Sequence, residues 1–166
     1  MKLLVLRHDE AEPREAGAGP EVDAKRALTP EGHKRAVRAG RALAKLVGEL
    51  DLLATSPLRR ARETAEALRR ELDGVELTET DVLAPGKSPA EVAAWLGAQE
   101  GIEQAAVVGH EPGLSQLVTW LVSGLSSPWL EIGKGGACLL ELPDRIAPGQ
   151  ARLLWLLRPG QLRKLR

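Results

Sequence analysis

Two histidines each follow a short apolar run of residues. Residues 3–6 (LLVL) lead through Arg7 into His8, and residues 105–109 (AAVVG) lead into His110. Apolar runs this short are typical of strands that are buried on both faces of a parallel sheet. If both runs are parallel strands of one sheet, both imidazoles lie at its carboxyl edge, where open α/β sheets bind their ligands. A histidine in that place can act as a nucleophile.

Three arginines follow the next apolar run, at the start of an expected helix. Arg59, Arg60 and Arg62 fall in the first turns of a helix expected over about residues 57–72, although acidic residues usually occupy the first turn of a helix. Guanidinium groups bind phosphate through paired, charge-assisted hydrogen bonds, and packed cations disfavour protonation of an imidazole. The combination predicts a phosphate site in which a neutral histidine attacks phosphorus and forms a phosphohistidine intermediate.

Strand and helix signals alternate along the chain, which predicts an α/β protein with a mainly parallel sheet. Thr29-Pro30, Ser56-Pro57 and Ser88-Pro89 each combine an N-cap residue with a proline and so indicate helix starts. Besides the two runs above, strands are expected at residues 51–54, 75–78, 137–142 and 153–157, the last two antiparallel. Helices are expected at residues 30–47, 57–72, 89–99 and 114–122.

Other segments lack a regular period. Residues 9–28 are expected to form a long loop that leaves from the Arg-His edge, and loops of this length are usually functional. Trp129, Leu130 and Ile132 are expected to anchor a turn-rich stretch over residues 123–136, which includes residues 133–136 (GKGG). That glycine-rich run lacks the full phosphate-loop spacing, so it predicts an ordinary turn. The basic tail from Arg158 is expected to fray into solvent.

Composition limits the possible partners. The chain has 166 residues, with 23 Lys and Arg against 23 Asp and Glu, so no net charge attracts nucleic acid or an anionic membrane. No apolar run approaches the ~18 residues of a membrane span, and no signal-peptide pattern is present. The single cysteine, Cys138, fits a reducing compartment. We therefore expect a single domain over residues 1–166, located in the cytoplasm, with neither a nucleic-acid nor a membrane partner.

Four motifs resemble those of a known family. Leu6-Arg7-His8 resembles the signature of the histidine phosphatase (phosphoglycerate mutase-like) superfamily. Its further motifs are resembled, in order, by residues 26–32 (RALTPEG), 56–65 (SPLRRARETA) and 107–112 (VVGHEP). The small size and the Arg-x-Leu-Thr-Pro-x-Gly element resemble the SixA-type phosphohistidine phosphatases. This resemblance implies a three-layer α/β/α fold of the phosphoglycerate mutase-like kind, with a mainly parallel sheet and an antiparallel edge.

The resemblance also implies roles for individual residues. His8 would be the catalytic nucleophile. Four further residues match positions that hold the phosphoryl oxygens: Arg7, Arg26, Arg60 and His110. Arg59 and Arg62 match no arginine of the family and are expected at the surface or at the edge of the substrate site. Asp9 stands where the usual signature has glycine, a position at which SixA-type relatives vary.

The mutases of this family use a glutamate as general acid, and this sequence shows no clear counterpart. Glu79 and Asp81 are nearest in order, but the local sequence singles out neither. Expelling an alkoxide requires a proton donor, whereas an imidazole leaves far more readily. The missing acid therefore favours a phosphatase, with no metal and no cofactor, that acts on phosphohistidine of a phosphorylated protein. The alternative is a phosphomonoesterase acting on a small phosphorylated metabolite.

Two rival functions have less support. A metal hydrolase could use His8, His110 and acidic loop residues, but the sequence contains no compact ligand motif such as H-E-x-x-H. A non-catalytic module that only binds phosphate would need cations but no neutral nucleophile, so the retention of His8 argues against it.

Overall fold

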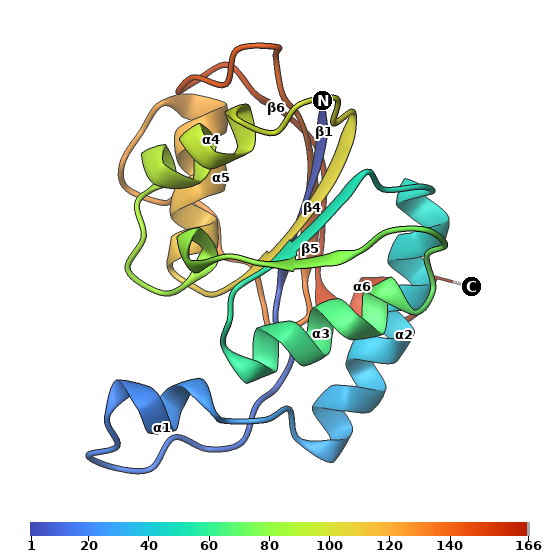
Figure 1. The fold of residues 1–166 in the computed structure, drawn as a ribbon, viewed down its shortest axis with the longest axis vertical. Helices are drawn as coiled ribbons and strands as arrows, with labels where there is room; N and C mark the ends of the chain where they lie inside the picture. Colours follow the sequence, from blue (N-terminus) through green and yellow to red (C-terminus); the bar gives the residue numbers. More distant parts are fainter. Residues whose placement is uncertain (166) are drawn as a thin grey trace.

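A computed structural model describes residues 1–165 of the chain, and its centre is a six-stranded sheet in the order β3-β2-β4-β1-β5-β6 (Figure 1). Four strands run parallel: β1 (Lys2–Arg7), β2 (Leu52–Thr55), β3 (Leu77–Glu79) and β4 (Gln104–Gly109). The last two strands are β5 (Ala137–Glu141) and β6 (Arg152–Leu157). Strand β5 runs antiparallel to both β1 and β6. The predicted parallel sheet with an antiparallel edge is therefore confirmed.

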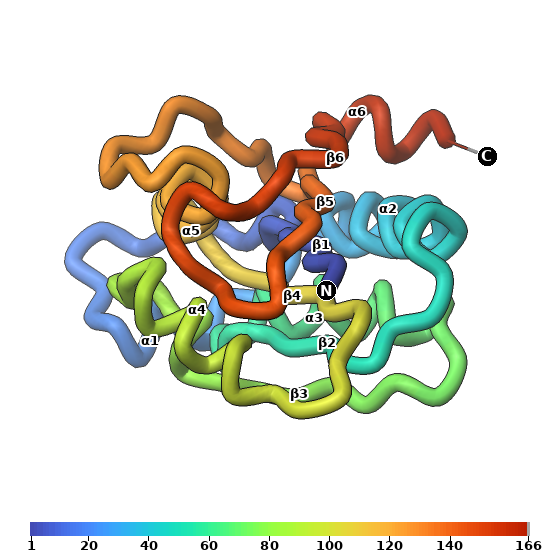
Figure 2. Tube along the Cα trace, turned by 90° about the horizontal axis from the view of Figure 1, so that it is seen from above, coloured from blue at the N-terminus to red at the C-terminus, as the bar shows by residue number. Residues whose placement is uncertain are grey.

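Helices cover both faces of the sheet and complete three layers (Figure 2). On one face lie α2 (Pro30–Val47), α3 (Arg59–Arg69) and α6 (Pro159–Leu162). The other face is covered by α4 (Pro89–Gly97) and α5 (Gly113–Ser123). A single-turn 3-10 helix, Asp81–Leu83, connects β3 to α4.

The alternation of side chains along β1 joins the two outer layers to the sheet. Leu3 and Val5 belong to the core beneath α4 and α5, whereas Leu4 and Leu6 belong to the core beneath α2 and α3. Because both faces of this strand are apolar and covered, the run reads as continuously hydrophobic in the sequence. Strand β1 therefore lies between the two cores. It ends at Arg7, the first residue after the buried run that is partly exposed.

Two of the three predicted helix starts are confirmed. The Thr29 hydroxyl accepts a hydrogen bond from the Gly32 amide and begins α2, and Ser88 and Glu91 form the capping box of α4. The third is wrong, because α3 begins at Arg59 with Leu58 as N-cap and no side-chain cap. The predicted cap, Ser56, is buried instead against His110.

Other segments are more ordered than predicted. The expected loop over residues 9–28 contains a short helix, α1 (Pro20–Ala24), and an isolated bridge between Ala11 and Leu28. The basic tail folds into α6, whose Leu162 is fully buried in the core beneath α2 and α3. Trp129 is 52% exposed and does not serve as an anchor, whereas Ile132 is buried as expected. The order of these segments depends on contacts with residues distant in sequence, which a local sequence pattern does not show.

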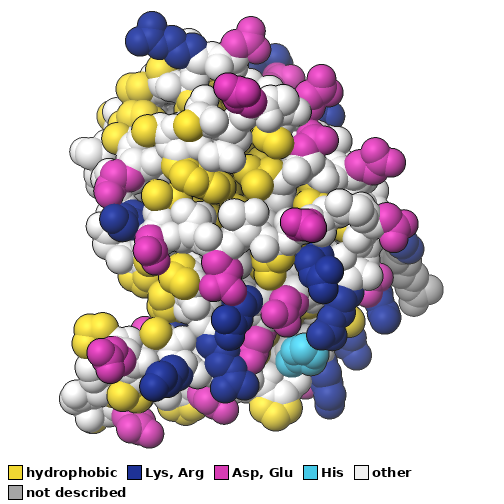
Figure 3. All heavy atoms as spheres, in the orientation of Figure 1, with side chains coloured by type: hydrophobic (Ala, Val, Ile, Leu, Met, Phe, Trp, Pro, Cys, Tyr) yellow, Lys and Arg dark blue, Asp and Glu magenta, His cyan; other side chains and the backbone are white. Residues whose placement is uncertain are grey.

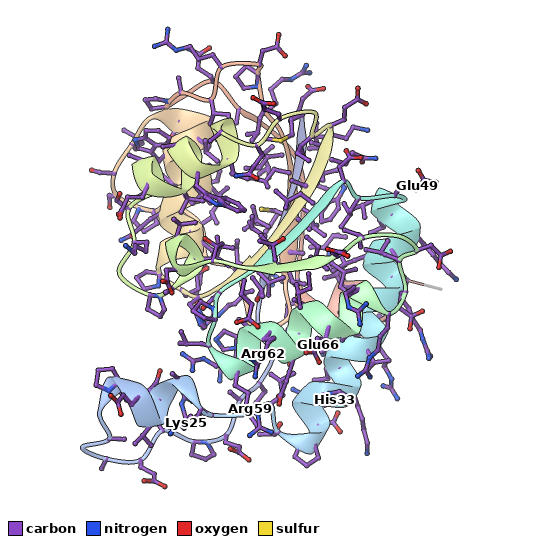
Figure 4. The ribbon with its side chains drawn as sticks, in the orientation of Figure 1. Lys25, His33, Glu49, Arg59, Arg62 and Glu66 are labelled. Atoms are coloured by element: carbon purple, nitrogen blue, oxygen red, sulfur yellow. The ribbon has the colours of Figure 1, made fainter. Side chains whose placement is uncertain are left out.

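Charges of both signs are mixed on the face shown in Figure 3, where acidic and basic side chains lie among one another. His33 is exposed on α2 (Figure 4). Within residues 1–165 no helix is long and apolar enough to cross a membrane.

Burial of Leu162 predicts that the C-terminal turn stabilises the fold. Leu162→Ala should lower the free energy of unfolding by about 2–5 kcal/mol, because it removes a fully buried side chain and leaves a cavity. The matched control is Leu165→Ala, since Leu165 is 45% exposed on the same tail. Chemical denaturation of both variants measures the difference, and equal effects would show that the tail is not packed as described.

Candidate active site

The carboxyl ends of β1 and β4 bring the two strand-end histidines together. The strands are parallel neighbours, paired so that Arg7 lies beside Gly109, and the next residue of each is a histidine. The rings of His8 and His110 therefore approach to 4.9 Å between centroids, with their planes inclined at 55°. Both side chains are buried. The expectation that the two imidazoles meet at one edge of the sheet is confirmed.

Both histidines line a pocket with a volume of about 360 Å³. Arg7, Arg26 and Arg60 line the same pocket, so all five residues predicted from the sequence are brought together. The other residues of the lining are Ala11, Arg14, Asp23, Pro85, Glu111 and Lys134. The pocket is therefore walled mainly by charged groups and imidazoles, which suits a small, highly charged guest.

One hydrogen bond determines how His8 faces this pocket. Its Nδ1 lies 2.6 Å from the carbonyl oxygen of Asp9, and a carbonyl can only accept, so Nδ1 carries the ring hydrogen. In the neutral ring the lone pair is then on Nε2, which accepts a hydrogen bond from Nε of Arg60 at 3.3 Å. The nitrogen with the lone pair is thus held beside a guanidinium group, and attack on a phosphoryl group by Nε2 would require this hydrogen bond to Arg60 to be given up.

Burial and neighbouring cations keep both imidazoles neutral. The pKa of His8 is lowered to about 4, chiefly by burial and further by Arg60, Arg7 and Lys134, against the hydrogen bond to the Asp9 carbonyl. The pKa of His110 is lowered to about 3, again chiefly by burial and then by His8 and Arg60. At neutral pH the site therefore holds neutral imidazoles among positive charges, as the sequence predicted for one of them.

A single carboxylate, Asp23 of α1, joins three arginines. Its Oδ2 lies 3.0 Å from Nη2 of Arg60, and its Oδ1 lies 2.8 Å from Nη2 of Arg26 and 3.7 Å from Nε of Arg14. Its backbone carbonyl also accepts a hydrogen bond from Nη1 of Arg60 at 2.8 Å. Burial alone would raise the pKa of Asp23, but the Arg26 hydrogen bond and the charges of Arg60 and Arg26 outweigh it and lower the pKa. Asp23 therefore stays ionised and orients the guanidinium groups.

Two buried nitrogens of the pocket residues have no hydrogen-bond partner in the described chain. They are Nε of Arg7 and Nδ1 of His110. Arg7 is fixed by its Nη1, which donates to the Ile132 carbonyl at 2.7 Å. In His110 the Nε2 atom lies 2.8 Å from the Ser56 hydroxyl, and if that hydroxyl donates, Nδ1 carries the hydrogen. Buried polar groups normally find partners, and phosphoryl oxygens are suitable acceptors for both nitrogens.

Comparisons with known proteins agree with this geometry. A profile of the histidine phosphatase superfamily (branch 1) matches residues 3–84. An uncharacterised protein of Picosynechococcus sp. is 33% identical to the chain over 138 residues, which cover 82% of each protein. The chain belongs to the histidine phosphatase superfamily. As a member it is a phosphatase, a class of enzyme that hydrolyses phosphorylated substrates without needing a metal.

Solved structures show that this histidine phosphatase has the predicted phosphoglycerate mutase-like fold. The protein histidine phosphatase SixA complexed with tungstate superposes with a TM-score of 0.83 at 24% identity, over 98% of this chain and 99% of that one. A proposed SixA from Agrobacterium tumefaciens gives 0.77 at 21%, over 95% and 97%. A proposed α-ribazole-5′-phosphate phosphatase from Escherichia coli gives 0.78 at 18%, over 96% and 98%.

Both carboxylates that line the pocket, Asp23 and Glu111, already form ion pairs or accept hydrogen bonds within the protein. Asp23 binds three arginines, and Glu111 accepts hydrogen bonds from the Ser115 hydroxyl, the Ser115 amide and the Ile132 amide. Glu79 and Asp81, the acids nearest in sequence order, do not line the pocket. Glu79 instead lies 3.3 Å from Arg62. Within residues 1–165 no three His, Cys, Asp or Glu side chains are grouped to hold a metal ion.

Sequence reasoning missed several residues of the pocket region. Asp23 lies in what was expected to be a loop, Ser56 matched a helix cap, and Lys134 belongs to a glycine-rich turn that matched no phosphate motif. Asp23 lies in a segment that contains several other acids, so no local signal distinguished it. Arg59 and Arg62, expected at the surface or at the edge of the substrate site, do not line the pocket. Arg59 is exposed and Arg62 is half-buried on α3, and each pairs with a glutamate (Figure 4).

The contrast between Arg60 and Arg62 on one helix gives a matched test of the site. Arg60→Ala should lower kcat/KM by roughly two to four orders of magnitude, because charge that develops on the phosphoryl oxygens loses a preorganised donor. Arg62→Ala should have little effect, since its side chain is 42% exposed and lies outside the pocket. Steady-state kinetics with an aryl phosphate compares them. Equal losses would show that the assignment of these arginines is wrong.

The lowered pKa of His8 predicts how the enzyme responds to acid. An imidazole can attack phosphorus only when it is neutral, that is, above its pKa. If His8 is the nucleophile, a pKa near 4 keeps it competent to well below the ordinary value of 6.5. We expect the ¹⁵N chemical shifts of the His8 ring to titrate with a midpoint near pH 4, with assignments from a His8→Asn variant. A midpoint near 6.5 in the folded protein would contradict the described environment.

Proposed function

We propose that this histidine phosphatase removes phosphoryl groups from phosphohistidine side chains of proteins, through a covalent intermediate on His8. Nε2 of His8 attacks phosphorus, and a new P–N bond forms as the P–N bond of the substrate histidine breaks. The departing imidazole is protonated by solvent. Water then attacks the phosphorus on His8, inorganic phosphate leaves, a proton passes to solvent, and the neutral imidazole is restored.

The protein's own groups supply positioning and charge rather than a proton. Arg7 and Arg60 neutralise the phosphoryl oxygens, and Nδ1 of His110 is available to donate a further hydrogen bond. The hydrogen bond from Nδ1 of His8 to the Asp9 carbonyl keeps the lone pair on Nε2 throughout and stabilises the charge that develops on the ring. Preorganised donors of this kind supply much of the rate enhancement in phosphoryl transfer.

The observation that carries the choice of substrate is the engagement of both pocket carboxylates. Asp23 is held by three arginines and Glu111 by three hydrogen-bond donors, so neither is poised to protonate an alkoxide. An imidazole leaving group does not require that proton from the enzyme. The likeness to SixA structures supports the same choice.

A small-molecule phosphomonoesterase is the second candidate. The pocket volume of about 360 Å³ lies within the range for small ligands. Among the solved structures with this fold are a proposed α-ribazole-5′-phosphate phosphatase and a mycobacterial glucosyl-3-phosphoglycerate phosphatase. These enzymes act on phosphate esters, so the leaving group separates the two candidates.

The test compares leaving groups. We expect kcat/KM to be highest for a phosphohistidine-bearing protein, intermediate for aryl phosphates and lowest for alkyl phosphates, because the enzyme provides no acid for an alkoxide. Glu79→Gln and Asp81→Asn should leave phosphohistidine turnover nearly unchanged. A profile that is flat with leaving-group pKa, or a large loss in either amide variant, would favour the phosphomonoesterase.

The covalent step has its own control. Denatured wild-type enzyme, quenched during turnover, should carry acid-labile, alkali-stable phosphate, and the His8→Asn variant should carry none. Undiminished turnover by His8→Asn would overturn the covalent mechanism whichever substrate is preferred.

A further inference from the structure

The glycine-rich turn at residues 133–136 is tied to the backbone of the nucleophile. The Gly135 amide lies within hydrogen-bond distance of the carbonyls of both Arg7 and His8, at 3.2 and 3.1 Å. The Arg7 amide donates to the Gly136 carbonyl at 3.1 Å, and the Gly136 amide donates to the Gly133 carbonyl at 2.7 Å. The turn is therefore held directly against the end of β1.

Glycine is required at the centre of this turn for two reasons. Gly135 has φ +71, in the left-handed region that other residues rarely adopt. A Cβ atom at this position would also lie 2.2 Å from Oδ2 of Asp9, which is itself buried. The turn packs tightly against Asp9 and is hydrogen-bonded to the end of β1. The backbone of the residue between Gly133 and Gly135 is therefore held in one position.

That residue is Lys134, and it lines the pocket of His8 and His110. Its positive charge contributes to the lowered pKa of His8, an effect that agrees with an ammonium group directed toward the site. The side chain itself is exposed, so a substitution there leaves the core intact.

Lys134 differs from the other cations of the pocket in its partners. Arg14, Arg26 and Arg60 each form an ion pair with Asp23, and Nη1 of Arg7 donates to the Ile132 carbonyl. Within residues 1–165 Lys134 forms neither a hydrogen bond nor an ion pair. Its donors are all available to a guest.

We propose that Lys134 is a further phosphate-binding residue, whose ammonium group donates a hydrogen bond to an oxygen of the phosphoryl group on its way to His8. The proposal rests on the pocket being the phosphatase site, but it does not depend on phosphohistidine being the substrate. Lys134 would add a cation from the segment of residues 131–136, which Arg7 and Glu111 also contact.

The experiment measures binding of inorganic phosphate, the reaction product, by isothermal titration calorimetry. Lys134→Gln should raise the Kd about ten-fold, as expected for the loss of one charge-assisted hydrogen bond. Lys134→Arg should restore affinity to within about three-fold, because it keeps the charge and the donors. The KM for an aryl phosphate should follow the same order.

Lys45→Gln is the matched control, because it removes the same charge from an exposed lysine in the last turn of α2 that does not line the pocket. Its Kd and KM should equal those of the wild type. Thermal unfolding of Lys134→Gln should also be unchanged, which separates lost binding from a damaged turn.

The outcomes distinguish the two proposals. An unchanged Kd in Lys134→Gln, together with weakened binding in Arg60→Ala, would overturn the role of Lys134 and leave the proposed function standing. Failure of Lys134→Arg to restore binding would also overturn it. A wild-type protein that binds no phosphate and hydrolyses no phosphorylated substrate would overturn both.

Discussion

The parallel pairing of β1 with β4 is the interaction on which the site depends. Its register places Arg7 beside Gly109, so the residue after each strand leaves the core at the same level of the sheet. Because β1 is buried on both faces between two helical layers, this register cannot slip without moving apolar side chains into the wrong layer. The stability of the central sheet and the 4.9 Å approach of the two imidazoles therefore have the same cause.

The electrostatics of the pocket combine charges that repel with one carboxylate that organises them. Arg14, Arg26 and Arg60 converge on Asp23, which lets guanidinium groups approach a buried histidine without leaving their donors unpartnered. The burial of His8 among these cations lowers the stability of the fold in acid. The pKa of His8 is about 4 in the fold and 6.5 as a free side chain, so the unfolded chain binds more protons between those values, and stability falls as pH falls through that window.

The two walls of the pocket come from parts of the chain that are far apart in sequence. One wall is α1 within the long connection from β1 to α2, and the other is the turn at residues 133–136 before β5. Asp23 connects the first wall to Arg60, which donates to His8, and Gly135 connects the second wall to the carbonyls of Arg7 and His8. A rigid sheet edge with loops that supply the charges is a common way to build a specific site on a general fold.

Apolar runs, capping residues and motif spacing are local signals, so they sufficed to predict the α/β class, most strands, two helix caps and the grouping of His8, Arg7, Arg60 and His110. Arg26 was also anticipated from its motif. Three contacts could not be predicted without the fold: the ion pairs of Asp23 with the arginines, the hydrogen bond of Ser56 with His110, and the burial of Leu162 in the tail. Each of these contacts joins residues remote in sequence, and a polar side chain's partner depends on which elements the fold brings beside it.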